Sequence, residues 1–74
     1  MTEQERIALA RRMARTGEGR AIRRAADMPT RAVAAFVGVS RNTVVRWEAG
    51  SRAPSGRRAV AYMDLLERVL EGEL

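Results

Sequence analysis

The sequence predicts an all-α domain, a compact bundle of about five helices. Alanine and arginine, which both favour helix, are abundant among the 74 residues. Apolar residues recur three and four positions apart, and no alternation typical of strands is sustained. Only two prolines interrupt the chain. Its length suits one domain with a modest core of Ala, Val, Leu, Ile and Met.

The first predicted helix covers residues 2–15, within an N-terminal extension over residues 1–17. Thr2, followed three residues later by Glu5, is typical of a capping box. Gly17 then ends the helix. Its arginines could form a DNA-binding arm, but we expect them in solvent or at a dimer surface. The expected apolar stripe consists of Ile7, Ala10, Met13 and Ala14.

A core over residues 18–56 is predicted to start with a helix over about residues 20–27. Met28-Pro29 is expected to end this helix, because a residue before proline disfavours the helical region. Three residues should face inward, namely Ile22, Ala25 and Ala26.

The next two helices are predicted over residues 31–37 and 41–49. Thr30 and Ser40 stand immediately before them and are candidate caps. Gly38 is expected to make the turn between them with a positive φ, and Gly50 to end the second.

The last predicted helix lies at about residues 57–71, in a C-terminal segment over residues 57–74. Its apolar residues cover more than one buried stripe, so one side should pack on the domain and the other should meet a second copy. The alternative is a wide core face with some exposed leucine. The dimerisation candidates are Tyr62, Leu65, Leu66, Val69 and Leu70.

Composition argues against several classes of protein. The chain has no cysteine and no histidine, so common nucleophiles, bases and zinc ligands are missing and neither an enzyme nor a bound metal or cofactor is expected. No apolar run approaches the roughly 18 residues that span a membrane. The first residues lack the order of a signal peptide. We therefore expect a soluble cytoplasmic protein.

The charge is basic and uneven. All 14 basic residues are arginine, and the net charge is +5. Residues 1–58 carry 13 arginines against 5 acidic residues, whereas residues 59–74 carry 1 against 4. The excess of positive charge over residues 1–58 indicates an anionic partner, although an arginine-rich composition can also reflect GC-rich coding.

Residues 30–50 have the spacing of a helix-turn-helix. Ala34 allows the two helices to approach, Gly38 makes the turn, and Val44 locks the second helix onto the first.

Residues 18–58 resemble the Cro/phage-repressor type of helix-turn-helix domain, most clearly in the stretch VAAFVGVSRNTVVRWEAGSRAP at 33–54. The resemblance implies a lambda-repressor-like fold, here with an extra N-terminal helix and a long C-terminal helix, and binding of double-stranded DNA. It also implies an ion pair between Glu48 and Arg23. The chain departs from the family pattern at Arg31 and at Ala35-Phe36.

A helical wheel of residues 41–49 puts Val44 and Trp47 inward and a polar side outward. Arginine can pair with guanine and asparagine with adenine, while Val45 can touch a thymine methyl. The candidate base-contacting residues are Arg41, Asn42, Thr43 and Arg46. Helix starts and flanking arginines can bind phosphates. The phosphate candidates are Thr30, Arg31, Ser40 and Arg52.

Together these features predict a homodimeric, sequence-specific transcriptional regulator, most simply a repressor of phage or mobile-element type. Two reading helices would enter successive major grooves of a near-palindromic operator, about 34 Å apart. One alternative is an antitoxin or accessory regulator that binds a partner protein. Another is a protein-interaction adaptor that does not read DNA.

Overall fold

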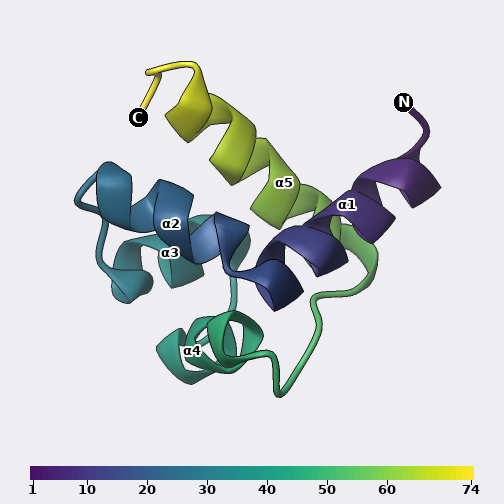
Figure 1. Cartoon of the computed structure of the whole chain (residues 1–74), viewed down its shortest axis with the longest axis horizontal. Helices are drawn as coiled ribbons and strands as arrows, with labels where there is room; N and C mark the ends of the chain where they lie inside the picture. Colours follow the sequence, from purple (N-terminus) through teal and green to yellow (C-terminus); the bar gives the residue numbers. More distant parts are fainter.

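Five α-helices and no strand make up the structure, a computed structural model that describes residues 1–74 (Figure 1). The prediction of an all-α bundle of about five helices is confirmed. None of the helices has the length and apolarity needed to cross a bilayer. The helices are α1 (Glu3–Thr16), α2 (Glu18–Ala25), α3 (Thr30–Val37), α4 (Arg41–Ala49) and α5 (Gly56–Leu70).

Helix α1 begins with the predicted capping box. The Thr2 hydroxyl accepts a hydrogen bond from the Glu5 amide at 3.1 Å, and the Glu5 carboxylate accepts one from the Thr2 amide at 2.9 Å. These bonds lower the pKa of Glu5 because they favour its charged form. Gly17, in the left-handed conformation at φ 87°, ends α1 and lies directly before α2.

The ends of α2 and the start of α3 differ from the prediction. Helix α2 stops at Ala25, and the Met28 amide bonds back to the Arg23 carbonyl at 3.1 Å, so the chain turns before the proline is reached. Thr30 is not the cap of α3. The Pro29 carbonyl already accepts from the Ala32 amide at 3.0 Å, which makes Pro29 the cap and Thr30 the first helical residue.

The turn between α3 and α4 forms as expected. Gly38 takes a φ of 84°, and Ser40 caps α4 by accepting from the Thr43 amide at 3.2 Å. A Cβ atom at Gly38 would meet nothing within 4 Å. The positive φ, rather than lack of space, therefore favours glycine at this turn.

The core lies where α1, α3, α4 and α5 meet. Trp47 and Tyr62 are in contact near its centre, with ring centroids 5.3 Å apart. Helix α2 adds Gly19, whose backbone lies against the Tyr62 hydroxyl; a Cβ atom there would stand 2.1 Å from that oxygen. The buried apolar residues are Ala10, Met13, Ala14, Val33, Ala34, Val37, Val44, Trp47, Ala59, Tyr62, Met63, Leu65 and Leu66.

Two further residues, at the end of α2 and just after it, are placed differently from the prediction. Ala25 and Ala26 were expected to face inward, but both are exposed, and Ile22 is only half-buried. They are exposed because they line an open groove between α2 and the end of α5 and are not covered by another helix.

Helix α5 is covered by the chain's own N-terminal helix. Helix α1 packs against α5 (Figure 1). Its Arg6 pairs with Asp64 and Glu67, at 2.8 Å for the second pair. The hydrogen bond from Arg6 lowers the pKa of Glu67. Most of the apolar residues of α5 are therefore buried against α1, α2 and α3 of the same molecule.

The expected dimerisation surface is accordingly wrong for three of its five residues. Tyr62, Leu65 and Leu66 are each 1% exposed and belong to the core of one molecule. Val69 is half-buried and Leu70 is 65% exposed, so only these two reach the surface.

Candidate nucleic-acid interface

Helix α4 turns a polar ridge to solvent. Its apolar side is fixed in the core by Val44 and Trp47, which are 0% and 2% exposed. Asn42 and Arg46 are exposed, and at 100° per residue they point about 40° apart. The ridge is held rigidly because the residues on the opposite side of the helix are buried in the core.

The flanks of this ridge differ. Val45, 41% exposed, lies about 60° to one side of Asn42. Thr43 lies about 60° to the other side of Arg46, is half-buried, and has its hydroxyl 2.9 Å from that of Ser40. Thr43 therefore sits at the edge of the ridge and not on it.

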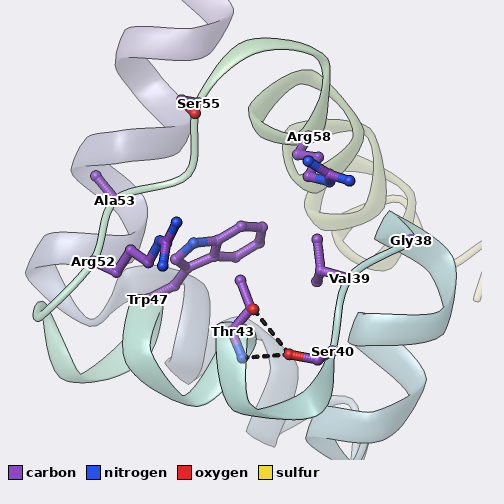
Figure 2. Close-up of a pocket in the computed structure, with 9 residues that line it drawn as sticks. All are labelled: Gly38, Val39, Ser40, Thr43, Trp47, Arg52, Ala53, Ser55 and Arg58. Atoms are coloured by element: carbon purple, nitrogen blue, oxygen red, sulfur yellow. Dashed lines mark hydrogen bonds between the residues drawn. The ribbon is translucent and has the colours of Figure 1, made fainter.

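A polar hollow, called here the Arg52 hollow, opens on the Thr43 side. Figure 2 shows Arg52 and Arg58 on opposite sides of the Trp47 ring, with Thr43 and Ser40 below it. The serines that precede α4 and α5 both line the hollow, and the Ser55 side chain makes no capping bond. The full lining is Gly38, Val39, Ser40, Thr43, Trp47, Arg52, Ala53, Ser55 and Arg58.

A second polar hollow, the Arg20 hollow, lies on the Val45 side of the ridge. Arg20 of α2, Thr30 at the start of α3 and Arg41 of α4 meet around it. Its remaining lining residues are Arg23, Val45, Glu48 and Ala49. The ridge is thus flanked on both sides by hollows that contain arginine and the start of a helix.

The charges at the helix starts set α3, α4 and α5 apart. Helices α1 and α2 begin with glutamates, as the helix dipole favours. The other three have no acidic residue in the first turn and carry arginine there instead. Such arginines are unfavourable beside the positive end of a helix, and a bound anion would relieve the repulsion. They are Arg31, Arg41, Arg57 and Arg58.

An ion pair ties α4 to α2. Arg23 Nε donates to one Glu48 carboxylate oxygen at 2.6 Å, and Arg23 Nη2 donates to the other at 2.9 Å. Both side chains are largely buried, at 14% and 8% exposed. Arg23 also donates to the Met28 carbonyl at 3.0 Å. Glu48 is therefore neutralised, and this is the pair that the family resemblance implied.

The hydrogen bond to Glu48 is also the main cause of a raised pKa at Arg23, which keeps the guanidinium charged. A permanently charged Arg23 holds α2 and α4 in one orientation relative to each other. The direction of the polar ridge thus depends on this pair.

The structure brings together most of the residues expected from the sequence. Arg41, Asn42 and Arg46 are exposed on α4, and Ser40 and Arg52 line the same hollow. Thr30 lines the other hollow, whereas Arg31 is exposed and lines neither.

Sequence reasoning missed Arg20, Ser55 and Arg58. A signal was available for Arg58, because an arginine in the first turn of a helix is electrostatically unfavourable without an anion nearby. Arg20 carried no such signal, since Glu18 already gives α2 a favourable start.

A family model described as helix-turn-helix matches residues 20–72. The chain belongs to the helix-turn-helix family. The resemblance to the Cro/repressor type is confirmed, and the family is one of DNA-binding regulators. Comparisons with curated proteins and with solved structures give no match. Helix α1 lies outside the matched residues of this helix-turn-helix protein.

Proposed function

We propose that this helix-turn-helix protein is a sequence-specific transcriptional repressor that reads the major groove with α4. The observation that supports this most directly is the exposed ridge of Asn42 and Arg46 between two arginine-lined hollows. The major groove is about 12 Å wide and admits one helix, with a phosphate backbone on either side. The ridge suits the base edges, and the hollows suit the two backbones.

Each residue of the ridge has a role in this proposal. Arg46 donates two hydrogen bonds to a guanine, and Asn42 pairs with an adenine. Arg41 reaches bases or phosphates from the first turn of α4, while Val45 contacts a thymine methyl. Thr43 remains a candidate base contact, although its place beside Ser40 favours the phosphate side.

Phosphates are bound on both flanks of α4. In the Arg52 hollow, Arg52 and Arg58 supply charge, and the starts of α4 and α5 supply backbone N–H groups. In the Arg20 hollow, Arg20 supplies charge, and the start of α3 at Thr30 supplies backbone N–H groups. Arg31 contributes its charge from the exposed side of α3.

Two copies bind a near-palindromic operator in this proposal, in the manner of a phage or mobile-element repressor. The support is the resemblance at residues 33–54 together with an apolar groove between α2 and the end of α5. This groove is lined by Ala21, Ile22, Ala25, Ala26, Val69 and Leu70. Its exposed Leu70 suits a partner surface.

A protein partner is the second candidate occupant of this groove. In Figure 1, α4 lies at the foot of the view and the end of α5 at the top, so the groove stays accessible when α4 is on DNA. An antitoxin or accessory regulator would use it in this way. Sedimentation of the protein with and without operator DNA separates the two, because only self-association predicts two copies in the complex.

The test of sequence reading is selection of binding sites from random duplex DNA at fixed, near-physiological salt. The wild-type protein is expected to enrich a two-fold symmetric site. Arg46→Ala should relax the base preference at one position of the selected site. It should reduce the free energy of discrimination at that position by about 1 to 3 kcal/mol. Arg24→Ala is the matched control, since Arg24 is exposed and lines neither hollow.

Phosphate binding has a separate signature. Arg58→Ala should weaken binding to all sequences alike and reduce the slope of log K against log salt by about 1. Enrichment of no sequence, with binding that disappears as salt rises, would refute sequence reading and favour the protein-interaction adaptor.

A further inference from the structure

The loop between α4 and α5 walls the Arg52 hollow and has few hydrogen bonds of its own. At its start, the amides of Ser51 and Arg52 bond to the Arg46 carbonyl at 3.0 and 3.3 Å. At its end, the Ser55 carbonyl accepts from the Ala59 amide at 3.2 Å. Between these points the loop makes no backbone–backbone hydrogen bond.

Besides the buried ring of Pro54, one side-chain hydrogen bond ties the middle of this loop to the rest of the protein. Arg11 Nη1 donates to the Pro54 carbonyl at 3.2 Å. That carbonyl accepts no backbone amide, so Arg11 is its one donor in the protein. The neighbouring Arg52 and Ser55 are the residues that the loop contributes to the hollow's polar surface.

Arg11 is itself firmly placed. It stands in α1 between the buried residues Ala10 and Met13, so the backbone beneath it is fixed in the core. Arg6, one turn earlier, is paired with α5. Helix α1 thus provides a rigid base from which the Arg11 guanidinium reaches the loop.

We infer that Arg11 is a positioning residue for DNA binding, and that α1 is part of the DNA-binding apparatus through the loop it holds. The inference rests on the proposed function. Arg11 acts through the Pro54 carbonyl, keeping Arg52 and Ser55 where a phosphate meets them. A loop that is already ordered loses less conformational entropy when DNA binds, and this raises affinity.

The size of the effect follows from the bond. A hydrogen bond from a charged donor is the stronger kind, but this one is partly exposed to water. Its loss is expected to weaken operator binding about fivefold.

The experiment compares Arg11→Ala with Arg12→Ala. Both changes remove one positive charge from an exposed position of α1, but Arg12 makes no hydrogen bond to the loop. Affinity for the selected operator is measured across a range of salt. The ¹⁵N order parameters of the Ala53 and Ser55 amides are measured without DNA and report the rigidity of the loop directly.

The expected result has three parts. Arg11→Ala weakens binding about fivefold relative to Arg12→Ala. The two variants share the same salt slope, because neither loses a phosphate contact. The order parameters of Ala53 and Ser55 fall only in Arg11→Ala.

Equal affinities for the two variants would overturn the inference, as would unchanged order parameters in Arg11→Ala. A salt slope lowered by about 1 in Arg11→Ala alone would make Arg11 a direct phosphate contact and also overturn it. Failure of the wild-type protein to bind any duplex refutes the DNA function, and the inference with it. If the wild type binds the operator and the two variants bind it with equal affinity, the inference about Arg11 is refuted but the proposed DNA function is not.

Discussion

Alkaline pH should destabilise this protein through one side chain, Tyr62. It is the only tyrosine, and the chain has no lysine, histidine or cysteine, so no other side chain except arginine titrates above neutral pH. The Tyr62 hydroxyl is buried without a hydrogen-bond partner. Burial first, and then the nearby negative charge of Glu48, raise the pKa of Tyr62 to about 12.

The sign and size of the effect follow from this shift. In the unfolded chain tyrosine ionises near pH 10, whereas the folded protein retains the proton. The folded state therefore keeps its full stability below about pH 10. Its stability falls as pH rises toward 12, because the unfolded chain gives up the tyrosine proton first. At pH 11 the free energy of unfolding should be lower by about 1.4 kcal/mol than at pH 8.

The assay is urea denaturation followed by circular dichroism between about pH 8 and pH 11, for the wild type and for Tyr62→Phe. The variant should lose most of the pH dependence, and phenolate absorbance in the folded wild type should stay low at pH 10 to 11. A phenolate signal that rises near pH 10 in the folded protein would refute the reasoning. An equal loss of stability in Tyr62→Phe would refute it too.

Three further predictions concern the core and its ion pairs. Gly19→Ala should lower the free energy of unfolding by about 2 kcal/mol, because its Cβ would clash with the Tyr62 hydroxyl. In a double-mutant cycle, Tyr62→Phe removes that hydroxyl and should reduce the cost of Gly19→Ala by at least about 1 kcal/mol. Glu48→Gln should cost about 2 kcal/mol in urea denaturation and weaken operator binding, since it leaves Arg23 buried and unpaired; an unchanged midpoint would contradict this. The wild type should lose stability as pH falls below 4.5, because Glu67 has a lowered pKa when folded, and Glu67→Gln should show a smaller loss in acid titration.

Local features were predicted well because their causes lie within a few residues. The capping box at Thr2 and Glu5 and the Ser40 cap depend only on contacts three residues apart. The turn at Gly38 depends on one backbone angle. The ion pair of Arg23 and Glu48 spans 25 residues, and only the family resemblance implied it.

Predictions about which face meets which neighbour were less successful. Nothing in the local pattern says whether the second apolar side of α5 meets another molecule or α1, because an apolar stripe indicates that a face is buried but not what buries it. Residues 25 and 26 looked buried because they continue an apolar spacing, yet they line a groove beside the end of α5 that stays open to solvent.

The sequence by itself determined the five helices, the caps at Thr2 and Ser40, the turn at Gly38 and the exposed polar side of α4, because all of these depend on short-range spacing and backbone angle. Only the tertiary structure decided how these pieces meet. It buried three expected interface residues in the core of one molecule, and it formed the two hollows from helix starts distant in sequence. It also brought Arg11 to the Pro54 carbonyl, 43 residues away. Such contacts depend on the packing of the whole core, which no single segment encodes.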